Sequence, residues 1–228
     1  MSISCIKRFT ALIAVLIGGI SIAQDNFETL GESSFALDHK VSNSYSYNFA
    51  ARSRYYLYQD KATTLTNRQI DLVHFSTLKL NYNRSVSFGI QYRFRAVFDG
   101  GSNELRLTQQ FNYTKQNLAL RFGHRVRFEQ RILEAITIFR SRYRFAVDFA
   151  LKGEKLDIGE PYFVASMEAL LSQNQNIKSE LDHRITAHIG WLISEKLKLQ
   201  VGLEYRVEAL NISTEQKLFI LSAVNLKI

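Results

Sequence analysis

Cysteine, proline and long apolar segments are nearly absent from this sequence of 228 residues, and each absence excludes a class of protein. The only cysteine is Cys5 and the only proline is Pro161. Without cysteine in the rest of the chain, disulfides, thiolate metal sites and a cysteine nucleophile are excluded there. Residues 9–22 form the longest uncharged apolar run, shorter than the roughly 20 residues that a membrane-spanning helix needs. Any membrane insertion must therefore use strands.

The N-terminus has the three parts of a secretory signal peptide. Lys7 and Arg8 are basic, residues 9–22 are apolar, and Ser21-Ile22-Ala23 places small residues where a signal peptidase reads them. Residues 1–23 are therefore predicted to be a cleaved signal peptide, with the mature chain starting near Gln24. No cysteine follows the apolar run, so a lipid anchor is not expected.

Apolar and polar residues alternate through most of the remaining chain. Between Val86 and Phe98, aromatic and aliphatic residues occupy one parity, while serine, glutamine and arginine occupy the other. The same pattern recurs in residues 118–131, 139–151 and 196–208. A period of two is typical of a strand with one apolar and one polar face, whereas a helix would scatter the arginines around all its sides.

A soluble antiparallel sandwich also alternates, but two features favour a membrane barrel. The alternating segments are longer than the usual 5–6 residues or so of soluble strands and reach the roughly 9–11 that tilted membrane strands need. Aromatic residues lie near several strand ends, as in the aromatic girdles of outer-membrane barrels: Tyr45, Tyr82, Phe98, Tyr113, Tyr162 and Trp191. The predicted fold class is all-β, an antiparallel up-and-down transmembrane β-barrel of about 10–12 strands in a bacterial outer membrane.

Ten strands are predicted individually, an even number as expected for a single-chain bacterial barrel. They span residues 43–58, 69–82, 86–98, 104–114, 118–131, 137–151, 161–171, 182–192, 196–208 and 216–227. Short turns are expected at residues 83–85, 115–117 and 194–195, and longer loops at 59–68, 99–103 and 172–181. Residues 43–228 are thus assigned to the barrel. Residues 24–42 are left as an N-terminal segment that either adds a strand or lines the lumen.

Two arginine-rich runs resemble a known family. "HRVRFEQR" (124–131) followed by "FRSRYRF" (139–145) is similar to the repeated-arginine core of an uncharacterised group of outer-membrane barrels of the Bacteroidota, domain of unknown function 2490. The similarity extends from about Arg52 to the C-terminus. One departure is that Glu168 is followed by Ala169-Leu170, where the family usually has an aromatic residue after the glutamate. The resemblance implies a barrel fold and an outer-membrane location, and it implies no activity.

The polar parity of the strands should face the lumen, and it is rich in arginine. The predicted lumen charge network, which is also the candidate anion site, comprises Arg93, Arg95, Arg106, Arg125, Arg127, Glu129, Arg131, Arg140, Arg142, Arg144, Asp148, Glu168, Arg184, Glu204 and Arg206. Arg52 and Arg54 share this parity. One interpretation is a lumen filled by arginine–carboxylate ladders between neighbouring strands, which would give the barrel a non-catalytic role.

A second interpretation starts from the excess of arginine over acids on these faces. Unpaired positive charge in a lumen is costly, so a small anionic solute could offset it, either in an anion-preferring channel or at a bound phosphate or carboxylate. Other expected partners are outer-membrane lipids and lipopolysaccharide, and the barrel-insertion machinery during assembly. Nucleic acid is not expected, because aromatics and arginines lie on opposite faces of each strand.

An outer-membrane hydrolase is the third and weakest interpretation. His188 shares a face with Asp182 and Arg184, and Ser166 shares one with Glu168. A serine–histidine–acid set is recognised by geometry and not by order along the chain, so these residues could form one. No group of histidines and acids has the spacing of a metal site, and no cofactor is predicted.

Overall fold

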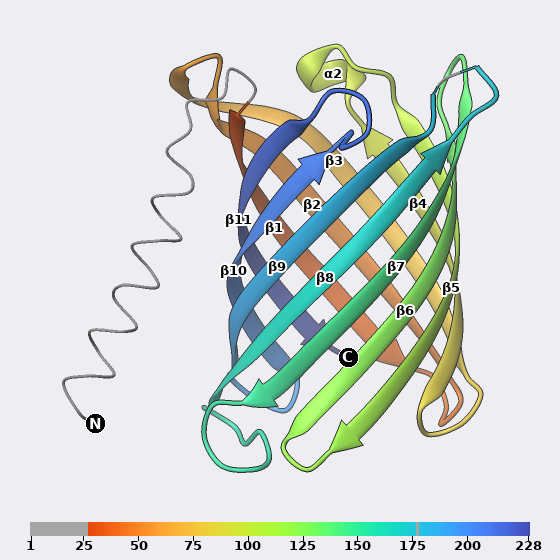
Figure 1. Cartoon of the computed structure of the whole chain (residues 1–228). Coiled ribbons are helices and arrows are strands. Elements are labelled where there is room, and N and C mark those ends of the chain that lie inside the picture. Colours follow the sequence, from red (N-terminus) through yellow and green to blue (C-terminus); the bar gives the residue numbers. More distant parts are fainter. Residues whose placement is uncertain (1–26, 177) are drawn as a thin grey trace.

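The computed structural model describes residues 27–176 and 178–228, so the predicted signal peptide lies outside the described residues. The described chain forms a closed barrel of eleven tilted strands (Figure 1). They are β1 (Phe27–Lys40), β2 (Tyr45–Gln59), β3 (Ala62–Lys79), β4 (Arg84–Phe94), β5 (Glu104–Asn117), β6 (Leu120–Ile132), β7 (Thr137–Ala150), β8 (Pro161–Gln173), β9 (Glu180–Leu192), β10 (Leu197–Glu208) and β11 (Glu215–Lys227). A short helix, α2 (Ala96–Asp99), follows β4. None of the described helices is long and apolar enough to cross a membrane.

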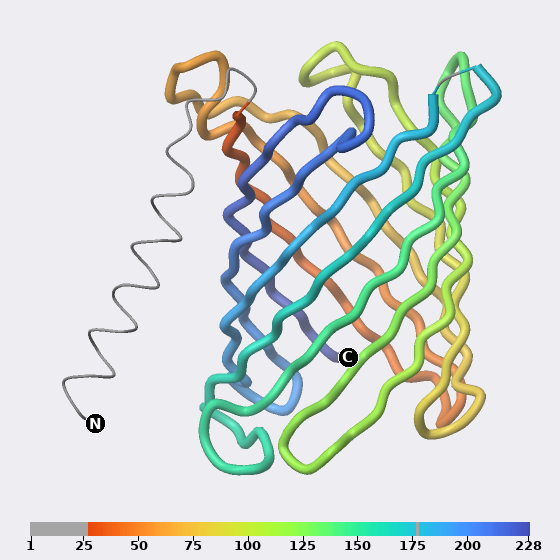
Figure 2. Tube along the Cα trace, in the orientation of Figure 1, coloured from red at the N-terminus to blue at the C-terminus, as the bar shows by residue number. Residues whose placement is uncertain are grey.

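The barrel closes between its first and last strands. β1 pairs with β2 on one side in the antiparallel sense and with β11 on the other side in the parallel sense, from Phe27 opposite Gln216 to Asp38 opposite Lys227. All other neighbouring strands are antiparallel and consecutive in the chain (Figure 2). Eleven strands lie within the predicted range of 10–12, but the number is odd and the β1–β11 pair is parallel, so the expected even number and purely antiparallel order are wrong. The segment preceding residue 43 supplies an additional strand, so the barrel begins at Phe27.

The odd strand number places the two ends of the strand series at opposite ends of the barrel. We call the end at which β1 starts and α2 lies the α2 end, and the end at which β11 stops the C-terminal end. Connections at the C-terminal end are short except for residues 151–160. At the α2 end they range from the two-residue turn at 60–61 to the α2 loop at 95–103.

Several sequence-predicted boundaries differ from the structure. The turn expected at 83–85 lies at 80–83, because Arg84 and Ser85 already belong to β4. The loop expected at 59–68 is a tight hairpin turn, in which Asp60 and Lys61 have φ values of 52° and 63°, the left-handed pair of a type I′ turn. Residues 115–117 belong to β5, and the turn follows at 118–119. β4 ends at Phe94, so Phe98 lies in α2 instead of on a strand.

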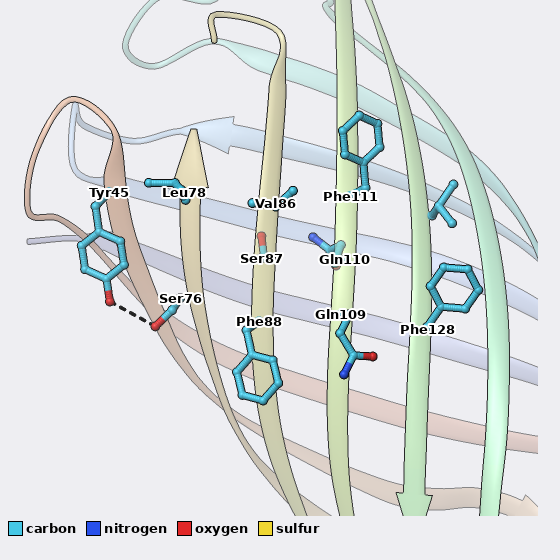
Figure 3. Close-up of a pocket in the computed structure, with 11 residues that line it drawn as sticks. Tyr45, Ser76, Leu78, Val86, Ser87, Phe88, Gln109, Gln110, Phe111 and Phe128 are labelled. Carbon is cyan, nitrogen blue, oxygen red and sulfur yellow. Dashed lines mark hydrogen bonds between the residues drawn. The ribbon is translucent and has the colours of Figure 1, made fainter. Parts of the chain in front are cut away.

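The outer face of the barrel is apolar. Phe88, Phe128 and Phe139 are 46%, 55% and 57% exposed, and they all lie on the outward parity of their strands. Figure 3 shows part of this face, where a shallow groove over β2 to β6 is lined by Leu78, Val86, Phe88, Phe111, Val126 and Phe128. The Tyr45 and Ser76 hydroxyls are hydrogen-bonded there at 3.1 Å, and Gln109 is a polar residue among the rings.

Four glycines lie directly opposite a ring on the neighbouring strand. The registered pairs are Gly31 with Tyr55, Gly89 with Phe75, Gly190 with Tyr162, and Gly202 with His188. In each pair the ring occupies the space that a Cβ on the glycine would need. Such aromatic cover over a strand glycine is a known device for fixing strand register.

Candidate functional site: the charged lumen

The interior of the barrel carries the charged side chains. Of the residues predicted for the lumen, Arg93, Arg106, Arg125, Arg127, Arg131, Arg140, Arg142, Arg144, Glu168, Arg184, Glu204 and Arg206 line one internal cavity. Glu129 is almost fully buried in the wall beneath them. Asp148 lies nearer the C-terminal end, where it pairs with Arg121 at 2.8 Å.

Arg95 occupies a different place from the one predicted. It follows β4 and begins the α2 loop, where its guanidinium donates to the Asp99 carboxylate at 3.1 Å. Burial alone raises the pKa of Asp99, but hydrogen bonds from Arg95 and the Gly101 amide, together with the charges of Arg95 and Arg68, outweigh burial and lower it. Arg95 therefore lines the α2 end of the cavity from the loop and not from a strand.

A first ion-pair cluster is built on Asp71 of β3. Arg93 donates through Nε and Nη2 to the two Asp71 oxygens at 2.8 and 2.9 Å, and Gln69 and Gln91 donate to the same carboxylate. Asp71 is 1% exposed and therefore has no contact with bulk water, so these donors supply the hydrogen bonds that a buried carboxylate needs. Its partners come from the same strand and from β4, its neighbour.

A second cluster connects β5 through β8. Glu104 accepts from Arg106 and Arg131, and Glu129 accepts from Arg142 at 2.9 Å. Arg142 also donates to Glu168 at 2.6 Å, so one guanidinium joins carboxylates of the strands on both sides of β7. The resulting charge-assisted network makes the wall of the lumen continuous over four strands.

A third cluster lies across β9, β10 and β11. Arg206 donates to Glu204 and stacks on the Phe219 ring at 3.7 Å from its centroid. Arg184 reaches Glu208 at 3.7 Å, and Lys217 donates to Glu208 at 2.9 Å. Phe219 itself packs with Leu30 and Tyr56 in an apolar cluster inside the barrel.

Several interior residues had not been predicted. Asp71, Glu32, Arg68 and Lys217 take part in the ion pairs, and Phe75, Leu30, Tyr56 and Phe219 are apolar residues on the inner face. In β3 the polar Gln69 shares the face of Asp71, but the apolar Val73 and Phe75 lie on the same face and obscure its parity. β1 gives no clear signal either, since its outward positions include Thr29, Gly31 and Ser33.

The cavity inside the barrel has a volume of about 520 Å³. It extends from Arg68 and Lys217 towards the α2 end to Gln200 and Asn225 further along the lumen. Among the described residues, fourteen arginines and one lysine line it, against the six carboxylates of Glu32, Asp71, Glu168, Glu180, Glu204 and Glu208. The ladders therefore cover the wall but leave internal space, and the lining of that space has a large excess of positive charge.

The candidate catalytic residues are not brought together. Ser166 and His188 both line the cavity, but in the part of the chain that the structure describes no hydrogen bond joins them. Asp182 is occupied by the Ala209 amide and lies 3.7 Å from Arg140. The described residues also contain no group of histidine, cysteine, aspartate and glutamate that could hold a metal ion.

The arginine-rich strands coincide with a family match. The model of a family described as "Protein of unknown function (DUF2490)" matches residues 33–216, which include all the strands that build the three clusters except β11, matched at its first two residues. The chain belongs to this family. No curated protein and no solved structure matches the chain. The family description names no activity, so the charged lumen is the structural feature that bears on function.

Proposed function

We propose that this DUF2490 member is an outer-membrane β-barrel with a non-catalytic role, whose lumen provides a narrow, anion-preferring passage. The support for the membrane is the outer face, where large apolar side chains are exposed around a closed sheet. A soluble protein rarely exposes an apolar area that extends over so many strands. The hydrocarbon core of a lipid bilayer would remove these apolar side chains from water.

The compartment is proposed from the N-terminus. A cleaved signal peptide at residues 1–23 would export the chain, after which the barrel-insertion machinery would place it among outer-membrane lipids and lipopolysaccharide. The arginine-repeat resemblance favours a bacterium of the Bacteroidota. N-terminal sequencing of the protein from isolated outer membranes would test both steps, and we expect the mature chain to start near Gln24.

The single observation that carries the anion preference is the composition of the cavity lining. Fifteen cationic side chains face six carboxylates, and rings of arginine and lysine select anions in membrane pores. Three buried acids behind the lining, Glu104, Glu129 and Asp182, do not balance this excess. A cation entering the lumen would meet net repulsion, whereas an anion would be attracted.

Conductance of the refolded protein in a planar bilayer tests the proposal. With a salt gradient across the bilayer, we expect current steps whose reversal potential indicates anion preference. Cation preference would contradict the role of the arginines. Absence of current from a barrel that is demonstrably folded would contradict passage and favour the ladder interpretation, in which the lumen is a filled structural core.

A further inference from the structure

Three of the arginines that line the cavity have no carboxylate partner. Within the described residues, Arg52 and Arg144 take part in no hydrogen bond or ion pair, and Arg125 donates only to the neutral Asn112 side chain at 3.1 Å. The Nε of Arg144 is also buried and unsatisfied. All three are partly buried, and partly buried guanidinium groups without a charged partner are costly, so their presence needs a physical reason.

The missing partners are present nearby but are taken by other arginines. Glu168 lies directly opposite Arg144 in the β7–β8 register, yet its carboxylate binds Arg142. Asp71 lies directly opposite Arg52 in the β2–β3 register, yet it binds Arg93. The two acids are thus engaged by neighbours, and this leaves Arg52 and Arg144 free to turn towards the lumen.

The unpaired groups lie on separate walls of one cavity. Arg52 is on β2, Arg125 and Arg144 are registered opposite each other on β6 and β7, and His188 is on β9. In the closed order of eleven strands these positions are distributed around the barrel. Hydroxyl and amide donors border the same space: Ser166, Thr186, Gln200 and Asn225.

We propose that Arg52, Arg125 and Arg144, together with His188, form a binding site for a phosphate group inside the lumen. A tetrahedral dianion offers several acceptor oxygens to planar guanidinium forks arriving from different directions, and its charge would offset the three unpaired cations. This inference rests on the proposed anion-accepting lumen and names the class of anion. Because the site is within the barrel, its ligand is inorganic phosphate or a small phosphate ester and not a lipid headgroup.

The test uses the full mature chain, refolded in a detergent without phosphate. Inorganic phosphate is titrated at constant ionic strength against chloride, and the midpoint of thermal unfolding and the phosphorus NMR linewidth are followed. We expect saturable stabilisation and line broadening by phosphate, and no saturation by chloride. In a second titration with inorganic phosphate present, vesicles that carry anionic phospholipid headgroups and vesicles that lack them should leave the phosphorus linewidth of the phosphate equally broad, because lipid headgroups do not compete for a site inside the barrel.

Matched variants separate this site from general charge screening. Arg144→Gln should weaken phosphate binding by at least roughly tenfold, and Arg144→Lys, which retains the charge without the fork, by an intermediate factor. Arg121→Gln removes an arginine of the same inner face that is paired with Asp148, and it should bind phosphate like the wild type. Equal weakening in Arg121→Gln and Arg144→Gln, or no saturable effect in the folded wild type, would overturn the site.

The outcomes are separable from those of the proposed passage. Anion current with no saturable phosphate effect would leave the passage and remove the phosphate site. Phosphate binding in a barrel that carries no current would leave the site and remove the passage.

Discussion

Arg125 and Arg144 lie directly opposite each other in the β6–β7 register, both facing the lumen, and no carboxylate separates them. Like charges that face each other across a strand pair destabilise it, by roughly 0.2–1 kcal/mol. The repulsion between Arg125 and Arg144 therefore lowers the stability of the anion-free protein. Salt that screens this repulsion should raise the stability again.

Replacing Arg144 by glutamine should stabilise the anion-free barrel. The substitution removes one of two opposed charges and leaves no carboxylate without its partner, because Glu168 remains bound to Arg142. We expect the unfolding midpoint to rise at low ionic strength, and the increase to shrink as chloride screens the repulsion. Denaturant unfolding in detergent at two ionic strengths measures both effects. A lower midpoint at both salt levels would refute the repulsion.

Arg142→Gln should have the opposite result. Arg142 binds Glu129, which is 2% exposed, and Glu168, so its removal would leave a buried carboxylate without a charged donor from β7. Loss of one partner of a buried pair costs about 3–5 kcal/mol. Arg121→Gln, at a pair in which the arginine is 55% exposed, should cost only about 0–1 kcal/mol. Comparable losses in the two variants would mean that Arg142 is not buried in a network.

Gln109 and Gln110, which are adjacent in β5, test which face of the barrel meets lipid and which faces the lumen. Gln109 points outward among Phe88 and Phe128, whereas Gln110 accepts hydrogen bonds from Arg127 at 2.6 and 3.0 Å. In a bilayer, Gln109→Leu should raise stability, since an amide in hydrocarbon is unfavourable. Gln110→Leu should lower it by about 1–3 kcal/mol, because Arg127 loses its acceptor. Unfolding from vesicles compares the two, and the opposite ranking would reverse the assignment of the faces.

Gly89→Ala should destabilise the barrel, because the new Cβ would collide with the Phe75 ring that covers this glycine. Forcing a methyl group into such a packed position costs about 1–3 kcal/mol. Gly123→Ala is the control, since a Cβ there would have only the Ala146 Cβ as a neighbour, at 3.9 Å. We expect Gly123→Ala to be neutral or slightly stabilising. Unfolding midpoints that fall equally in both variants would show that the ring contact is not responsible.

The selectivity of the passage should depend on the lumen and not on the net charge of the protein. Arg52→Glu would reverse one unpaired charge inside the cavity and should reduce anion preference in the bilayer recording. Lys178→Glu makes the same change in net charge at an exposed loop residue, and its reversal potential should stay near that of the wild type. A shift of the same size in both variants would assign the preference to the net charge of the protein.

The strands with regular alternation could be predicted from sequence because the two faces meet different surroundings. In β4, β6, β7 and β10 polar residues prevail at every second position, and this period alone places residues such as Arg93 and Arg142 on the inner face. For β1 the sequence leaves a strand and a lumen-lining piece as alternatives, since Ser33 and Gly31 on its outward face and Leu30 on its inner face obscure the pattern. The start of β3 is not predicted, because residues 62–67 contain three threonines and an asparagine without regular alternation, and they are held to β2 by backbone pairing.

The pairing of charges inside the lumen was beyond sequence analysis. Parity indicates that Glu168 and Arg144 share a face, but the choice of Arg142 as the partner of Glu168 depends on strand register and side-chain reach. Which arginines remain without a carboxylate depends on this pairing, so the sequence does not predict it. Arg95 was misplaced for a simpler reason, since β4 stops one residue earlier and the chain turns into α2.

Because β1 and β11 are parallel, the start of β1 and the end of β11 lie at opposite ends of the barrel, and a tight turn cannot join them. In a barrel with an even strand number, the last strand and the first are antiparallel, so a tight turn can join them. New termini can then be opened in another loop, which gives a circular permutant. Here Lys227 and Phe27 are separated by the length of a strand, so a circular permutant would need a crossover of about a dozen residues or more. For the same reason, a reporter fused just before Phe27 and one fused after Ile228 would label opposite ends of the barrel.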